Sequence, residues 1–358
     1  MESPLRKIAF VVEELGLDTP AQQLLDRFLI GYPTDGDFHR CQCQVSIWLV
    51  PGAPYAELRR RLADFPLERH DTIAAACKDA DAIVFVPRGV SAVNVLTEVI
   101  KCASANAALF VMGALAESLD DAKRIMELCK AGNVMLGAGM PVSVTFRLPN
   151  VDIPIGAKVK QALIVVQGES PLAELNTLEA MIPIVERRQN GERGVRRICR
   201  LQATDMWSQP DDLLPRRLLA AALSRSDTPQ GDAIKDGRTQ GLLDLGLVPK
   251  LAQNPHGWVL EHTDGLRTTI LILDGVVADS NFAVALADET IVSAQLYRPP
   301  PPQRHEFSQL AAVVEHYFRT RQPFAPTQRA MLIAGLLGAF KSYAGSGFVN
   351  VEGLEGER

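Results

Sequence analysis

The chain has 358 residues, of which 47% are hydrophobic and 22% charged, and 37 Lys and Arg against 42 Asp and Glu give a net charge of −5. This length predicts two domains, because a single hydrophobic core rarely serves more than about 250–300 residues. The composition excludes collagen-like, disordered and disulfide-scaffold proteins. The acidic balance gives no reason to expect nucleic acid as a partner.

The hydrophobic segments are too short to cross a membrane, so no membrane partner is expected. The longest, 330–340, would extend as a helix over about 16 Å of an apolar layer of about 30 Å. Near the N-terminus only residues 8–12 are continuously apolar before Glu13 and Glu14, which is too short for the core of a signal peptide. The six cysteines are scattered, as is typical of reduced thiols. We therefore expect a cytoplasmic protein.

In the first 140 residues, short apolar segments rich in β-branched residues alternate with segments of helical periodicity. The apolar segments predict buried strands, and the intervening ones predict helices. Strands are expected over 7–12, 45–50, 82–86, 108–112 and 134–138, and helices over 20–30, 55–63, 71–78, 92–103 and 119–131. Strands that alternate with helices through short connections predict a doubly wound parallel sheet. Residues 1–140 are thus expected to form a Rossmann-like domain.

From residue 141 the pattern predicts a second, α+β domain over 141–300. Strands over 160–168 and 195–203 flank a helix over 171–189, and another helix is expected over 211–224. Four strands follow in succession, with Asp264-Gly265 and Asp274-Gly275 as hairpin turns, over 258–263, 266–273, 276–285 and 291–297. This order predicts a mostly antiparallel, open sheet. Residues 301–358 carry two long helices, 303–321 and 327–344, which we expect to pack back on the two domains.

Three stretches of the sequence resemble the Gfo/Idh/MocA oxidoreductase family. They are 136–149 (LGAGMPVSVTFRLP), 261–269 (EHTDGLRTT) and 297–345, in which helices marked by aromatic residues and proline follow the final strand. The resemblance implies that family's fold, a doubly wound domain followed by an antiparallel sheet, over nearly the whole chain. It also implies the family's usual activity, which is hydride transfer between NAD(P) and a sugar, polyol or related alcohol.

Four features that this chemistry requires in the family are missing from the sequence. A dinucleotide needs a glycine-rich turn after the first strand, but residues 13–18 (EELGLD) carry one glycine and three carboxylates. Residues 50–52 (VPG), at the end of the second strand, supply no carboxylate for the ribose. The family's catalytic lysine is absent from 112–117 (MGALAE), and its histidine is absent from 174–179 (ELNTLE). Together these losses predict degenerate cofactor and catalytic motifs.

We therefore predict a non-catalytic member of the family, without a resident cofactor, that binds a small molecule or supports a partner enzyme. An anion is one candidate for that small molecule. The alternative is an NAD- or NADP-dependent oxidoreductase acting on a sugar, polyol or related hydroxy compound, in which Arg88, Glu98 or Glu179 replaces the missing groups. A lyase or hydrolase without a redox cofactor is a third possibility, because carboxylates remain.

Candidate cofactor-binding or ligand-binding residues are Arg88, Gly89, Ser91 and Pro141. The first three follow a sheet strand and open a helix, so they could cradle an anion with Ser91 as the cap, or form an ordinary capped helix with a surface arginine. Pro141 lies where the family has its domain junction. It could contact a ligand there, or only set the backbone of the crossover.

Weak candidates for catalytic residues are Glu98, Asn176 and Glu179. If Glu98 and Glu179 converge, they could form a pair of carboxylates; otherwise these positions belong to solvated helix faces. No metal site is predicted. Cys41-Gln42-Cys43 is a weak signal by itself, because alternate residues on a strand point the same way without forming a good disulfide, so it is assigned neither a metal nor a redox role.

Three further expectations concern surfaces. Ile270, Ile272 and Val276 should lie on the open face of the second sheet and need burial, which predicts a homodimer through that sheet. Residues 224–241 are polar and turn-rich, so they are expected to form a mobile lid in which Lys235 and Arg238 contact an anionic ligand, or a surface insertion without a role. A cluster of arginines over 187–200 predicts a solvated face or an interaction patch.

Overall fold

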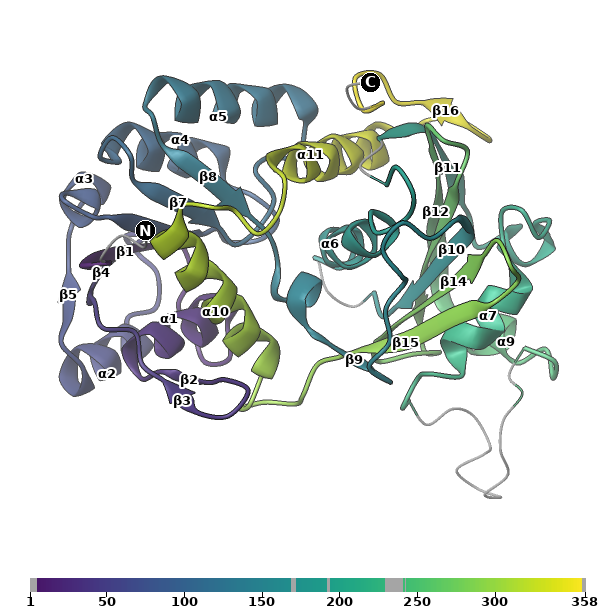
Figure 1. The fold of residues 1–358 in the computed structure, drawn as a ribbon, viewed down its shortest axis with the longest axis horizontal. Helices are drawn as coiled ribbons and strands as arrows, with labels where there is room; N and C mark the ends of the chain where they lie inside the picture. The colour runs from purple at the N-terminus through teal and green to yellow at the C-terminus, as the bar shows by residue number, and fades with distance from the viewer. Residues whose placement is uncertain (1–4, 169–171, 192–193, 229–240, 242, 356–358) are drawn as a thin grey trace. The chain divides into compact units, whose positions relative to one another are not determined.

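The computed structural model describes residues 5–168, 172–191, 194–228, 241 and 243–355. The chain divides into two compact units, Met1–Val144 with Pro299–Gly338, and Thr145–Arg298 with Ala339–Arg358 (Figure 1). The C-terminal helices are therefore shared between the two units. Most of the expected lid, including Lys235 and Arg238, lies outside the described residues.

The first unit contains a sheet of six parallel strands in the order β5-β4-β1-β6-β7-β8. These strands are β1 (Lys7–Val12), β4 (Gln44–Leu49), β5 (Leu67–Arg69), β6 (Ala82–Val86), β7 (Ala108–Val111) and β8 (Met135–Ala138). Numbered along the chain, their spatial order is 3-2-1-4-5-6, which is that of the dinucleotide-binding Rossmann fold. The predicted fold class is confirmed, with the short β5 as an addition.

Helices connect the strands and cover both faces of this sheet. They are α1 (Pro20–Leu29), α2 (Ala56–Asp64), α3 (Ile73–Cys77), α4 (Val93–Cys102) and α5 (Leu119–Ala131), joined by α10 (His305–Thr320), which packs against α1. A small hairpin, β2 (Tyr32–Pro33) and β3 (Phe38–His39), precedes β4. The short 3-10 helix η1 (Pro141–Val144) ends the first segment of the unit and packs against α10.

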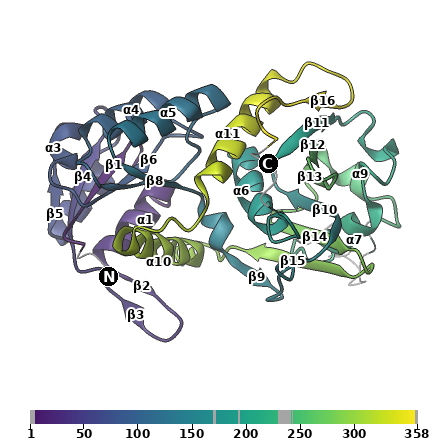
Figure 2. The ribbon, with the colours of Figure 1, turned by 45° about the horizontal axis from the view of Figure 1, so that its top comes forward.

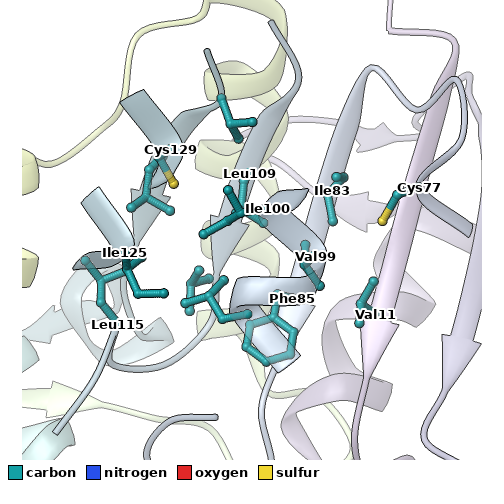
Figure 3. Close-up of a cluster of buried hydrophobic side chains, with 14 of the residues drawn as sticks. Val11, Cys77, Ile83, Phe85, Val99, Ile100, Leu109, Leu115, Ile125 and Cys129 are labelled. Carbon is teal, nitrogen blue, oxygen red and sulfur yellow. The ribbon is translucent and has the colours of Figure 1, made fainter. Parts of the chain in front are cut away.

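Continuous apolar strands produce the core of the first unit, because a parallel sheet is buried on both faces. Figure 3 shows Val11, Ile83, Phe85 and Leu109 from the strands beside side chains of α4 and α5, among them Val99. All five of these side chains have no solvent exposure. Each such burial stabilises the fold by about 1.5–3 kcal/mol relative to an exposed side chain.

The second unit contains an eight-stranded sheet in the order β16-β11-β12-β13-β10-β14-β15-β9. The strands are β9 (Phe146–Leu148), β10 (Val159–Val166), β11 (Val195–Leu201), β12 (Gln253–His262), β13 (Arg267–Asp274), β14 (Ser280–Leu286), β15 (Ile291–Tyr297) and β16 (Val349–Asn350). Its helices are α6 (Ala173–Val185), the 3-10 helix η2 (Met206–Ser208), α7 (Arg216–Leu223) and α9 (Val248–Leu251). Helix α11 (Thr327–Ser342) begins in the first unit and ends in the second. The mostly antiparallel sheet is confirmed.

One of the two expected hairpin turns is correct. At Asp264-Gly265, the N–H of His262 bonds to the carbonyl of Leu266 (2.8 Å) and joins β12 to β13. At Asp274-Gly275 the hairpin prediction is wrong, because β10 lies between β13 and β14 and pairs with β13 in parallel. A glycine at φ +79° suits either a hairpin or a crossing connection, so the local sequence cannot distinguish the two.

Helices of the same chain cover both faces of this second sheet (Figure 2). Val276 belongs to the hydrophobic cluster between the sheet and α7. On β13, Leu271 and Leu273 belong to the same cluster, so the alternate residues Ile270 and Ile272 point to the opposite face of the sheet, which α6 covers. All three side chains are at most 1% exposed. The expectation that they share one open face is therefore wrong, and their burial needs no second copy. The homodimer itself stays a prediction.

Part of the predicted basic cluster serves the second sheet. A bulge in β11 lets Arg196 and Arg197 both reach Glu261 on β12, and Arg267 on β13 donates to the same carboxylate at 3.3 Å. Glu261 is only 3% exposed. The hydrogen bond from Arg197 contributes most to lowering its pKa to about 2, and the hydrogen bond from Arg196 lowers it further. Arg197 and Arg267 also lie over the ring of Phe348, with Cζ 4.7 and 5.3 Å from its centroid. This cluster fastens the C-terminal segment to the sheet.

Candidate functional site

The candidate site is the carboxyl edge of the sheet in the first unit. Open α/β sheets bind their ligands where the strand order reverses, and here that point lies between β1 and β6. The segments that leave the four central strands at this edge are residues 13–19 after β1, 50–53 after β4, 87–91 after β6 and 112–117 after β7.

Glu13, the first residue after β1, closes the gap between β1 and β6. Its N–H donates to the carbonyl of Val86 (3.2 Å), and its Oε2 accepts the N–H of Arg88 at 2.9 Å. An N–H donor of the predicted anion cradle is therefore already bound by a carboxylate of the same chain. An incoming phosphate would have to displace this carboxylate and would be repelled by it.

The N-terminus of α1, which holds the pyrophosphate in dinucleotide-binding folds, is also occupied by its own residues. Pro20 at the first turn has no N–H, and the Oγ1 of the cap residue Thr19 accepts the N–H of Gln22 at 3.4 Å. Asp18, at φ +61°, holds its carboxylate beside this turn in an ion pair with Arg304 (2.9 Å). The helix dipole thus already has an anionic neighbour.

The segment after β4 is a backbone turn without a polar side chain. Val50 donates its N–H to the carbonyl of Val12 (3.0 Å), and Ala53 donates to Val50 (3.2 Å). The intervening Gly52 has φ +87° and open space around its Cα. The hydrogen bond to Val12 fixes this turn beside the end of β1, and none of its residues has a carboxylate that could bind a ribose.

The segment after β7 is apolar and closely packed. Ala114, Leu115 and Ala116 are at most 4% exposed, and the N–H of Ala114 bonds to the carbonyl of Val90 at 3.0 Å. A side chain added at Gly113 would meet Pro87 at 2.9 Å. The segment that would carry the family's catalytic lysine is thus packed against the loop after β6.

The structure places the four candidate binding residues in different surroundings. Arg88 and Gly89 are exposed, and Gly89 has φ +83° with open space around it. The expectation that Ser91 caps α4 is wrong, because Ala92 occupies the cap position and the hydroxyl of Ser91 instead donates to Glu117 at a long 3.5 Å. Pro141 is buried in η1.

The candidate catalytic residues are divided between the units. Glu98 is exposed on α4 of the first unit, more than a helical turn past the sheet edge. Burial raises the pKa values of Cys77 and Cys102, and the charge of Glu98 adds to both shifts. Asn176 and Glu179 lie on α6 of the second unit. Glu179 is 4% exposed, so the solvated-face interpretation does not hold for it. The Glu98–Glu179 pair stays a prediction.

The same helix carries a contact that the sequence analysis missed. The Oε1 of Glu174 accepts the indole N–H of Trp258 at 3.0 Å. Phe340 stacks on that indole with ring centroids 4.1 Å apart, and Tyr343 meets it edge-on at 5.4 Å. Where the family has a proton-transfer histidine nearby, this chain thus has a glutamate engaged in holding a buried tryptophan.

Neither a cluster of metal-binding side chains nor a membrane-spanning helix is found in the part of the chain that the structure describes. Within those residues, no group of three or more His, Cys, Asp or Glu side chains is placed to hold a metal ion. Among the described helices, none combines the length and the apolar character that crossing a membrane requires.

Comparison with protein-family models gave no match, and comparison with curated protein sequences gave none either. Solved structures do match. Myo-inositol dehydrogenase from Lactobacillus casei, solved with NAD(H) and myo-inositol, is similar over 98% of this chain and 97% of its own, with 12% identity and a TM-score of 0.59. Myo-inositol 2-dehydrogenase from Lactobacillus plantarum matches over 98% and 100%, with 11% identity and a TM-score of 0.58.

A third match has a different substrate. Biliverdin reductase from Synechocystis, solved with biliverdin and NADP+, is similar over 94% of this chain and 98% of its own, with 12% identity and a TM-score of 0.52. These likenesses establish the fold. The chain has the fold of the Gfo/Idh/MocA-type dehydrogenases, as its sequence resemblance implied.

Proposed function

We propose that this chain is a divergent Gfo/Idh/MocA-type protein that does not use a nicotinamide dinucleotide. In this proposal it binds a small molecule, for which an anion is one candidate, or supports a partner enzyme. The observation that carries it is the bond from the Arg88 N–H to the Glu13 carboxylate, at the point where such folds hold the pyrophosphate. We place the protein in the cytoplasm, because scattered cysteines without a structural disulfide are typical of proteins in a reducing compartment.

Three further features support this proposal. Asp18 and the proline at the start of α1 make that helix terminus a poor phosphate site. The loop after β7 packs apolar side chains where the family has its lysine. Glu174 is committed to Trp258. A proton donor or acceptor for hydride-transfer chemistry would have to come from elsewhere in the chain.

The alternative function is an NAD(P)-dependent oxidoreductase for a sugar, polyol or related hydroxy compound. It is favoured by one observation, which is that neighbours solved with NAD(H) or NADP+ share the fold over nearly the whole of both chains. In this alternative, Arg88 would meet the cofactor phosphates, and Glu98 or Glu179 would handle the proton.

A thermal-shift panel of inositols, sugars, sugar acids and inorganic phosphate, each with and without NADH, tests the proposed function. A compound at about 100 times its Kd should stabilise the fold by about 2.7 kcal/mol, and we expect that stabilisation to be independent of NADH. Arg88→Ala should reduce the response to anions only. Arg124→Ala, whose side chain is 75% exposed on α5, is the matched control. Steady production of NADH from NAD+ and any of these polyols would refute the proposal.

A further inference from the structure

The hairpin β2–β3 is joined to β4 by a segment in which two cysteines meet. Cys41 and Cys43 lie outside any strand, with Cys43 at a bend directly before β4. Their Sγ atoms are 3.3 Å apart, and both side chains are half-buried. The expectation that the two cysteines lie on a strand is therefore wrong, and the alternation of side chains along a strand does not apply to this segment.

The surroundings hold this segment in place. Glu315 on α10 accepts hydrogen bonds from Tyr32 and from the ring of His39, each at 2.9 Å, and is itself paired with Arg319 at 2.7 Å. Gly31, at φ +112°, approaches the returning strand so closely that a Cβ there would lie 2.4 Å from the carbonyl of His39. The chain entering Cys41 is thus anchored by contacts to α10 and to the end of α1.

We propose that Cys41 and Cys43 are a redox-active dithiol, which closes to a disulfide by exchange with a low-molecular-weight disulfide such as oxidised glutathione. The contact of the two sulfur atoms carries the proposal, because disulfide closure needs the second thiol within reach of the first. This site lies away from the sheet edge that carries the proposed function and does not depend on it.

The exchange proceeds in two balanced steps. The Cys43 thiolate attacks one sulfur of oxidised glutathione, which forms a mixed disulfide and releases one glutathione thiolate that takes up a proton. Cys41 then loses its proton and attacks the Cys43 sulfur, which forms the Cys41–Cys43 bond and releases the second glutathione. Two electrons pass from the protein thiols to glutathione disulfide.

The order of attack follows from the surroundings of Cys41. Hydrogen bonding to Cys43 and burial both raise the pKa of the Cys41 thiol, and the neighbouring Glu315 raises it further. Cys41 therefore holds its proton more tightly than an ordinary thiol does, and we assign the first attack to Cys43. Three of the other cysteines, Cys77, Cys129 and Cys199, are at most 6% exposed, which makes them poor competitors for a soluble disulfide.

Mass spectrometry of the full chain tests this directly. Trypsin cleaves after Arg40 and after Arg59, which gives a peptide that contains both cysteines and no other. After equilibration of the native protein with equal concentrations of oxidised and reduced glutathione, we expect most of this peptide to be two hydrogens lighter and to resist alkylation. Both cysteines alkylated, or both carrying glutathione, would overturn the proposal.

Two variants test the order of attack, and a third is the control. Cys41→Ser should accumulate glutathione on Cys43 at the wild-type rate of first attack. Cys43→Ser keeps the burial of Cys41 and the neighbouring Glu315, so it should react more slowly at Cys41. Equal rates in the two variants would overturn the assigned order. Cys102→Ser, at a half-buried position on α4, should close the Cys41–Cys43 bond as the wild type does.

Discussion

Replacing Arg27 by alanine should lower the free energy of unfolding of the first unit by about 3–5 kcal/mol. The guanidinium uses all five of its N–H donors. Nε donates to the hydroxyl of Ser308 (3.0 Å), Nη1 to the carbonyl and side-chain oxygens of Gln23 (2.7 and 2.9 Å), and Nη2 to the carbonyls of Gln303 and Arg304 (2.8 Å each). Alanine would remove all five of these hydrogen bonds at the junction of α1 and α10.

Chemical denaturation, with hydrogen exchange followed on peptides of α1 and α10, measures this loss in the unit concerned. Arg27→Lys should recover only part of the stability, because an ammonium group has three donors and no planar fork. Arg124→Ala removes an arginine that is exposed in the same unit, and should change the free energy of unfolding by no more than about 0.5 kcal/mol. Similar losses in Arg27→Ala and Arg124→Ala would contradict the role given to Arg27.

Glu261→Gln should lower the stability of the second unit by about 2–3 kcal/mol at pH 7, with a loss that depends on pH. The pKa of Glu261 lies at about 2 in the folded protein against an ordinary value of 4.5. Because the folded-state pKa is the lower one, the ionised carboxylate contributes its full stabilisation above about pH 4.5. That contribution is lost as the pH falls through 4.5 towards 2.

Urea unfolding at several pH values between 7 and 3 measures this dependence. The difference between wild type and Glu261→Gln should shrink steadily below pH 4.5, because the protonated wild-type carboxyl then resembles the amide. Glu289→Gln removes an exposed partner of Lys160 and should have a much smaller effect at pH 7. A wild-type-to-variant difference that is the same at pH 3 and pH 7 would show that the charge of Glu261 does not stabilise the sheet.

The sequence predicted the elements that depend on local pattern. Buried parallel strands such as β6 are continuous apolar runs, and their order along the chain implied a doubly wound sheet before any pairing was known. The short strands β5, β9 and β16 were missed, because two or three residues carry no measurable periodicity. The Asp274-Gly275 turn was wrongly predicted to form a hairpin, because β10, which is far away in the sequence, lies between the two strands that the turn connects.

At the candidate site too, contacts between residues far apart in the sequence could not be predicted. The carboxylates after β1 predicted that phosphates would be repelled, but not that Glu13 would bind the N–H of Arg88, which is 75 residues away. Likewise, the arginines over 187–200 predicted a solvated face or an interaction patch, whereas Arg196 and Arg197 converge on Glu261 through a bulge that sequence alone does not reveal. Long-range pairing determines which polar groups remain available to a ligand.

Isothermal titration calorimetry of the intact protein with NADH tests the central claim most directly. The claim is that the sheet edge at Glu13, Asp18 and Arg88 is satisfied by its own residues and does not accept a dinucleotide. The account predicts no saturable heat at NADH concentrations up to about 1 mM, which corresponds to a binding free energy weaker than about −4 kcal/mol. NADPH should behave the same way. A saturable titration with a micromolar Kd for either cofactor would contradict the account.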